Sequence, residues 1–151
     1  MKPVLLIGLG NTLMGDDGVG CVVAERLSGH PRLPPQVEVM SAGTDLLACA
    51  AHIEGRRRVV LVDAIQAGGE PGGVTRFEDL SELEQGQDHV HHLSVVQAAR
   101  LLQMAGGPTF VLIGVAVRSA EVSMELSPAL SERLPAILES VLAELAEPAE
   151  N

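Results

Sequence analysis

Three side chains in this sequence stand where an α/β protein commonly builds a site. They are Asp17, which ends a glycine-rich loop, Asp63, which follows an apolar run, and His91. Two carboxylate oxygens and one imidazole nitrogen suit a borderline divalent ion such as nickel or zinc, and they leave coordination positions open. The same carboxylates could instead act in acid/base chemistry.

The glycine-rich segment 8–20 also invites a nucleotide-binding interpretation. The dinucleotide fingerprint requires glycine at its sixth position, which is Leu13 here. The mononucleotide loop requires lysine followed by serine or threonine, where this chain has Asp16 and Asp17. Carboxylates at these positions repel phosphate unless a cation intervenes. We therefore expect no nucleotide cofactor.

Each candidate also has a purely structural interpretation. Asp17 could cap the helix that follows it, because acidic residues are common at helix starts. His91 could be solvated or act as a cap, as could its neighbours His89 and His92. Asp63 is harder to explain in this way, because a carboxylate after an apolar strand lies where α/β proteins form their sites. The sequence contains neither a His-Glu-x-x-His nor a Gly-x-Ser-x-Gly motif, which disfavours the common zinc proteases and serine hydrolases.

The segments that carry these residues alternate between strand and helix patterns. Apolar runs predict strands at 4–9, 59–62 and 110–115, and a further strand is expected at 37–40. Alternation predicts a half-exposed edge strand at 73–77. Helical spacing predicts a helix at 19–27 and a long one that starts near residue 127. A short helix at 45–53 and a helix at 91–104 are also expected.

This order predicts one three-layer α/β domain, residues 1–147, with a mostly parallel twisted sheet of about five strands flanked by helices on both faces. Residues 148–151 are expected to be a frayed tail. Ligand sites of such sheets lie beyond the carboxyl ends of the strands. Asp17 and Asp63 fall at that edge, and His91 could reach it from the start of its helix.

Composition narrows the functional classes. The chain has 151 residues, a net charge of −10 and a pI near 4.8, which argue against a nucleic-acid partner. The basic cluster 56–58 is expected to be a solvated loop. No apolar stretch approaches the roughly 20 residues that span a bilayer, so no membrane partner is expected. Without a secretory signal, Cys21 and Cys49 are expected to be reduced, buried side chains of a cytoplasmic protein that could act as a monomer.

Segments spread over nearly the whole chain resemble, in the same order, the hydrogenase maturation protease family. The matching segments are Gly8-Leu9-Gly10-Asn11-Thr12-Leu13, Asp16-Asp17-Gly18-Val19-Gly20, Gly43-Thr44, Val62-Asp63-Ala64, His91 with Leu93, Gly114-Val115 and Leu126-Ser127-Pro128. The combined pattern is specific, and the size and fold of the family agree with the expectations above.

The resemblance implies an endopeptidase that removes the C-terminal extension of a nickel-loaded [NiFe]-hydrogenase large-subunit precursor. It implies that Asp17, Asp63 and His91 are catalytic and bind nickel supplied by the precursor, and that Gly43 and Thr44 face the substrate. Asp16 is a weaker candidate. Departures from the family pattern concern substrate contacts and occur at Ser41, Asp45, Val117 and Ser123.

Two other functions remain open at this point. One is a non-catalytic metal-binding or chaperone module that recognises the nickel-loaded precursor without cutting it. The other is a nucleotide-binding regulator, which the loop composition disfavours.

Overall fold

The computed structural model describes residues 1–66, 68–84, 90–118 and 121–148, without the side chains of residues 83–94. Its five strands form one sheet in the order β2-β1-β3-β5-β4. They are β1 (Val4–Leu9), β2 (Val37–Gly43), β3 (Arg58–Ile65), β4 (Val74–Phe77) and β5 (Thr109–Ala116). Only β4 runs antiparallel to its neighbour. The predicted, mostly parallel sheet is confirmed.

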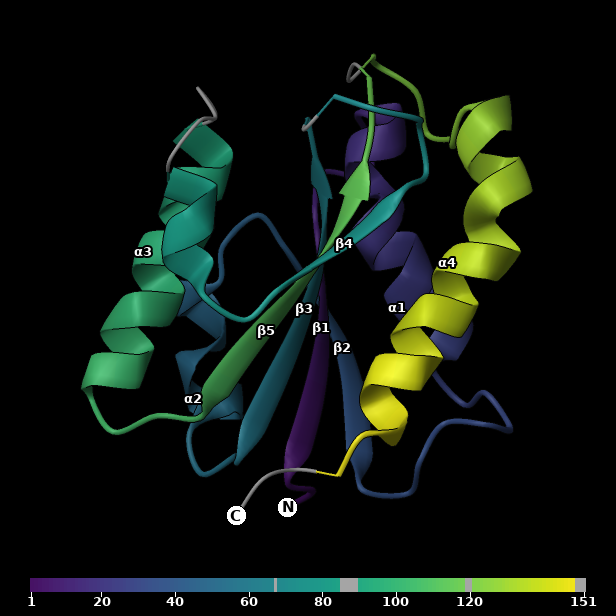
Figure 1. Ribbon diagram of the computed structural model, residues 1–151. Helices are drawn as coiled ribbons and strands as arrows, with labels where there is room; N and C mark the ends of the chain where they lie inside the picture. The colour runs from purple at the N-terminus through teal and green to yellow at the C-terminus, as the bar shows by residue number, and fades with distance from the viewer. Residues whose placement is uncertain (67, 85–89, 119–120, 149–151) are drawn as a thin grey trace.

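Helices cover both faces of this sheet (Figure 1). They are α1 (Val19–Leu27), α2 (Ala50–Ile53), α3 (Val90–Met104) and α4 (Pro128–Ala146), with short 3-10 turns η1 (Gly15–Gly18), η2 (Leu47–Cys49) and η3 (Leu80–Glu84). α1 and α4 lie on one face, and α2 and α3 lie on the other. The helix expected at 45–53 is split into η2 and α2. None of the described helices is long and apolar enough to cross a membrane.

The core is aliphatic and divided by the sheet. Successive side chains of a strand point to opposite faces, so Val60 and Val62 pack beneath α1 and α4, and Val59 and Leu61 pack toward α2 and α3. Every residue of β1 and β3 is buried, as central parallel strands require. Residues 149–151 lie outside the described residues, so the frayed tail stays a prediction.

The central strand is longer than the sequence indicated. Asp63 does not end β3, which continues to Ile65 and keeps its ladder with β5; Asp63 lies opposite Gly114. The apolar run stops at Val62, but pairing depends on backbone groups, and these continue past the carboxylate. Asp63 therefore lies within a strand, near its carboxyl end.

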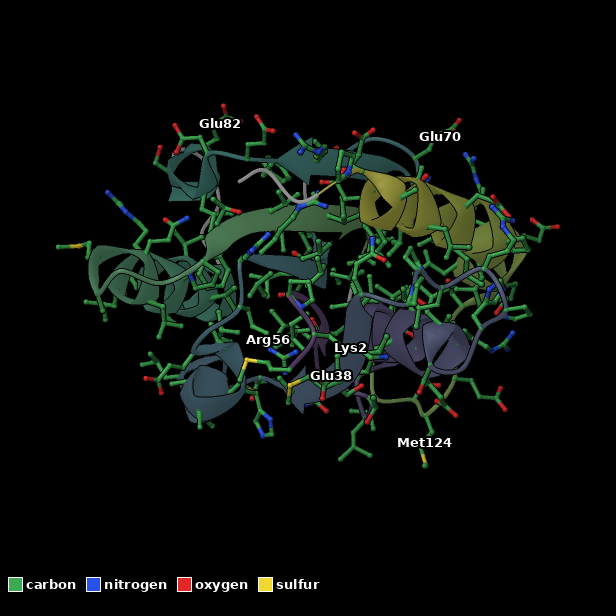
Figure 2. All side chains as sticks on the ribbon, turned by 90° about the horizontal axis from the view of Figure 1, so that it is seen from below. Lys2, Glu38, Arg56, Glu70, Glu82 and Met124 are labelled. Atoms are coloured by element: carbon green, nitrogen blue, oxygen red, sulfur yellow. The ribbon has the colours of Figure 1, made fainter. Side chains whose placement is uncertain are left out.

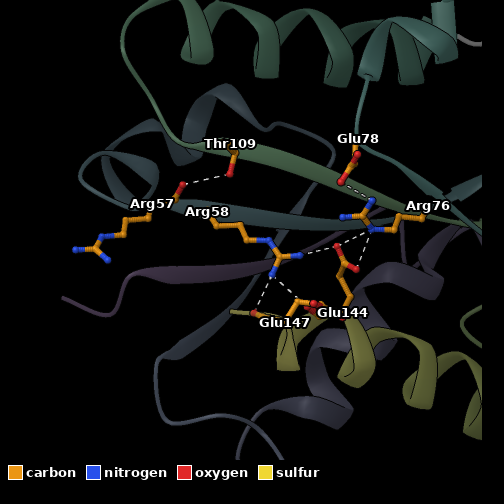
Figure 3. A network of polar contacts seen from close by, with 7 residues as sticks. All are labelled: Arg57, Arg58, Arg76, Glu78, Thr109, Glu144 and Glu147. Carbon is orange, nitrogen blue, oxygen red and sulfur yellow. Dashed lines mark hydrogen bonds and ion pairs between the residues drawn. The ribbon is translucent and has the colours of Figure 1, made fainter. Parts of the chain in front are cut away.

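The basic cluster 56–58 is not the solvated loop that was expected. Arg56 and Arg58 are both buried. Arg56 forms an ion pair with Glu38 at 2.6 Å (Figure 2). Arg58 forms one with Glu144 of α4 at 2.5 Å, and Arg76 binds the same carboxylate (Figure 3). Both arginines are buried because they pair with acidic residues from other elements, which a local pattern does not reveal.

Candidate active site

Close packing explains the glycines of the first loop. The first turn of α1 lies directly against β1 and β3, and a Cβ atom on Gly20 would stand 2.1 Å from the carbonyl oxygen of Val62 and 2.3 Å from that of Leu9. Gly10 has a φ of +131°, and a Cβ there would stand 2.0 Å from the carbonyl oxygen of Asp17. The absence of a Cβ at these glycines therefore allows the loop to pack closely against the sheet. Packing alone explains why glycine occupies these positions, without a phosphate ligand.

The two carboxylates of the loop have different surroundings. The N–H of Asn11 donates to Oδ2 of Asp17 at 2.9 Å. The cap position of α1 is Gly18, without a side-chain hydrogen bond, so the interpretation of Asp17 as a cap of α1 is wrong. Asp16 accepts the N–H of Ser127 on Oδ1 at 2.7 Å and thereby ties η1 to the start of α4. Both carboxylates thus accept a backbone N–H, and they differ in burial, since Asp16 is buried and Asp17 is half-buried.

Asp63 is fully buried, with an exposed fraction of 0%. Its Oδ1 accepts the N–H of Ala64 at 2.8 Å. Burial raises the pKa of Asp63 well above its usual range, and the negative charge of Asp17 raises it further. Asp17 and Asp63 therefore interact at the carboxyl edge of the central strands. A cation bound between them would relieve both the desolvation and the repulsion.

Cys21 is a neighbour of this pair that sequence reasoning did not connect with it. Its thiol lies 3.5 Å from the carbonyl oxygen of Gly10 and can donate to it. Burial raises the pKa of Cys21, and the charges of Asp63 and Asp17 add to the increase. The prediction of a buried cysteine is confirmed, and the raised pKa disfavours a nucleophilic thiolate. The signal for its location was its place in the first turn of the helix that follows the loop carrying Asp17.

The predicted substrate loop lies at the same edge. Gly43 ends β2, and its carbonyl oxygen accepts the N–H of Gly10 at 2.8 Å. Its φ of +61° turns the chain away from the sheet. Thr44 follows and is exposed. Both residues therefore border the loop that carries Asp17, and their contact with a substrate stays a prediction.

His91 is the second residue of α3. α3 runs antiparallel to β5, the strand that follows it in the chain. The first turn of α3 therefore lies at the carboxyl edge of the parallel strands, where Asp63 is located (Figure 1). The side chain of His91 lies outside the described residues. Among the side chains that are described, no group of three His, Cys, Asp or Glu residues is placed to hold a metal ion. The structure thus brings Asp17 and Asp63 together, and His91 as the third ligand stays a prediction.

The fold and the site define the class of this protein. It is a three-layer α/β protein with paired carboxylates at the carboxyl edge of its parallel strands. The family model of the hydrogenase maturation proteases matches residues 21–144. The chain belongs to the hydrogenase maturation protease family, and it is therefore an endopeptidase by family.

Known relatives agree with this assignment. The hydrogenase 2 maturation protease of Escherichia coli is 28% identical over 149 residues, which cover 95% of this chain and 91% of the relative. The structure of the hydrogenase maturating endopeptidase from E. coli has a TM-score of 0.82 at 29% identity and covers 96% of this chain and 92% of that one. The [NiFe] hydrogenase maturation protease from Thermococcus kodakarensis has a TM-score of 0.76 at 29% identity, with coverages of 97% and 94%.

Proposed function

We propose that this protein removes the C-terminal extension of a nickel-loaded [NiFe]-hydrogenase large-subunit precursor, and that Asp17, Asp63 and His91 bind the nickel of that substrate. The observation that carries the proposal is the burial of Asp63 beside Asp17. A buried carboxylate beside a second carboxylate attracts a cation strongly, because the cation would compensate the poorly solvated charge of Asp63 and the repulsion between the two. Nickel accepts the oxygen and imidazole ligands that this set would offer.

The proposed reaction is hydrolysis of one peptide bond. Nickel, held by the precursor and by the protease at once, positions the scissile bond and polarises its carbonyl group or the attacking water. A carboxylate takes a proton from the water, whose oxygen bonds to the carbonyl carbon. The carbon–nitrogen bond then breaks, and the proton passes to the leaving nitrogen. A precursor without nickel would lack the ion that orients the bond, so cleavage would wait for metal loading.

The experiment that tests the proposal follows the intact mass of hydrogenase large subunits in source cells that lack this gene. One subunit should keep its C-terminal extension and lose it when the purified protein is added. Asp17→Asn and Asp63→Asn should each lower the rate of processing by about a hundredfold or more, because a general base or metal ligand is lost.

Asp16→Asn is the matched control, since an Asn oxygen can still accept the N–H of Ser127. This variant should process at close to the normal rate. Normal processing by both the Asp17 and Asp63 variants would overturn the site. Binding of the precursor without any change of its mass would instead favour the non-catalytic recognition module.

A further inference from the structure

β2 leaves one edge of the sheet open beside the candidate active site. It is the terminal strand on its side, and among the described residues it pairs only with β1. The N–H of Val4 donates to the carbonyl of Gln36 at 3.2 Å. This bond determines which residues of β2 direct their backbone groups toward β1 and which direct them outward. Backbone groups of Met40 therefore face β1, and those of Val39 and Ser41 face outward.

A groove of about 730 Å³ follows this open edge and separates it from α1. Gly10 and Gly43 are part of its lining. Gly10 lies in the loop after β1, Gly43 ends β2, and the backbone of Gly10 packs against the carbonyl oxygen of Asp17. The groove therefore reaches the loop that carries Asp17.

The walls of the groove are chemically uneven. Val39 contributes a half-buried apolar surface from β2, and Cys21 and Ser28 line the side of α1. Among the described lining residues, Glu25 alone is charged, and it is exposed. A ligand that matches these walls offers backbone groups that form hydrogen bonds with the strand edge. It also offers small or apolar side chains that contact Val39 and a positive charge that pairs with Glu25.

We propose that an extended segment of the polypeptide substrate pairs with the open edge of β2 at Val39 and Ser41, and that a basic side chain of this segment binds Glu25. The proposal rests on the proposed function, because it takes the polypeptide that enters the site to be the precursor. Strand addition supplies affinity through the backbone and leaves selection to individual side chains. It also directs the bound chain along the groove toward Asp17.

Binding is tested with a probe that needs no cleavage. The probe is a synthetic peptide of the last 20 residues of the large-subunit precursor, without nickel, added to the ¹⁵N-labelled protein. The amides of Val39 and Ser41 should become protected from solvent exchange, and the amide of Met40 should change little because it already bonds to β1. Protection confined to other parts of the protein, or none at all, would overturn the proposal.

Two substitutions separate backbone pairing from side-chain contact. Ser41→Pro removes one outward N–H, which an edge strand tolerates, and should weaken peptide binding about tenfold while the thermal midpoint stays within a few degrees. Ser41→Ala keeps the N–H and should bind within about twofold of the wild type. Equal binding by all three proteins would overturn the pairing.

Glu25→Gln should weaken binding about twofold to fivefold in low salt. It should have no effect on a peptide whose basic residues are replaced by glutamine, because the pair is then already lost. An unchanged effect with that peptide would overturn the contact with Glu25.

Cleavage of the complete precursor distinguishes this inference from the proposed function. If the wild-type protein processes the precursor, Ser41→Pro should raise KM about tenfold and leave kcat within about twofold. Peptide bound at β2 together with an uncleaved precursor would support strand addition and contradict the protease assignment. Cleavage of the precursor without protection of the β2 amides would support the protease assignment and contradict strand addition.

Discussion

A carboxylate buried beside a second carboxylate costs free energy whenever it is charged, and Asp63 is in this position. Its exposed fraction is 0%, and burial followed by the charge of Asp17 raises its pKa. A cation bound by the site would reverse this cost, since it would give both charges a partner. The feature that we assign to metal recognition should therefore weaken the metal-free fold.

Asp63→Asn should accordingly raise the stability of the metal-free protein at neutral pH. The pKa of Asp63 is raised in the folded state, so the folded state holds its proton to higher pH than the unfolded state, and wild-type stability falls as pH rises above the unfolded value. The asparagine does not titrate, and its oxygen can still accept the N–H of Ala64. Thermal unfolding of both proteins between about pH 3 and pH 8 measures the effect.

The advantage of the Asn variant should be smallest near pH 3, where the carboxyl group is protonated in both states, and should grow to a few degrees near pH 7. A variant that is less stable than the wild type at every pH would show that Asp63 stabilises the fold. That result would contradict the free-energy cost that we assign to its buried charge. The same variant should fail to process the precursor.

The junction of α1 with β1 and β3 fixes the position of the loop that carries Asp17. Gly20 is the closest point of this junction, with a Cβ position 2.1 Å from the oxygen of Val62. Because that oxygen belongs to the central strand, it has little freedom to move away. A side chain at residue 20 should push α1 and η1 off the sheet.

Gly20→Ala should therefore destabilise the protein by about 3 kcal/mol or more, and processing should fall because Asp17 is displaced relative to Asp63. Gly29→Ala is the matched control, since the Cβ of residue 29 meets nothing within 4 Å. Its φ of +74° carries only a backbone cost of about 1–2 kcal/mol. Urea unfolding checks both values, and equal losses would show that the contact with the sheet is not what requires Gly20.

The same elements show what the sequence could predict. Apolar runs identified β1, β3 and β5, alternation identified the edge strand β4, and helical spacing identified α1 and α4, because one physical cause acts over each segment. Asp63 was located correctly at the edge, but β3 continues beyond it to Ile65, since one carboxylate does not interrupt backbone pairing. Burial of Arg58 was missed because its partner Glu144 follows 86 residues later. The link between Asp16 and Ser127 spans 111 residues and was missed for the same reason.

The two ends of the sheet carry different chemistry. The candidate site lies at the carboxyl ends of the parallel strands, and an ion network lies at the opposite end, where β3 begins and α4 ends (Figure 3). Arg58 donates to the carboxylate of Glu144 and to its backbone oxygen, at 2.5 and 3.1 Å. Arg76 of β4 donates to both oxygens of the same carboxylate at 2.9 Å. One buried glutamate thus joins α4 to the centre and the edge of the sheet.

Glu144→Gln should destabilise the fold without touching the chemistry of the site. Removal of one partner from a buried ion pair leaves the other charge uncompensated, at a cost of about 3 kcal/mol, and here Arg58 is the buried charge that remains. Glu139→Gln on the same helix breaks only the exposed pair with Arg32 and should change stability little. Urea unfolding measures the difference, and processing below the unfolding midpoint should be normal for both variants. A loss of processing by folded Glu144→Gln protein would mean that the network at the amino end controls the geometry of Asp17 and Asp63 through β3, and that the two ends of the sheet are coupled.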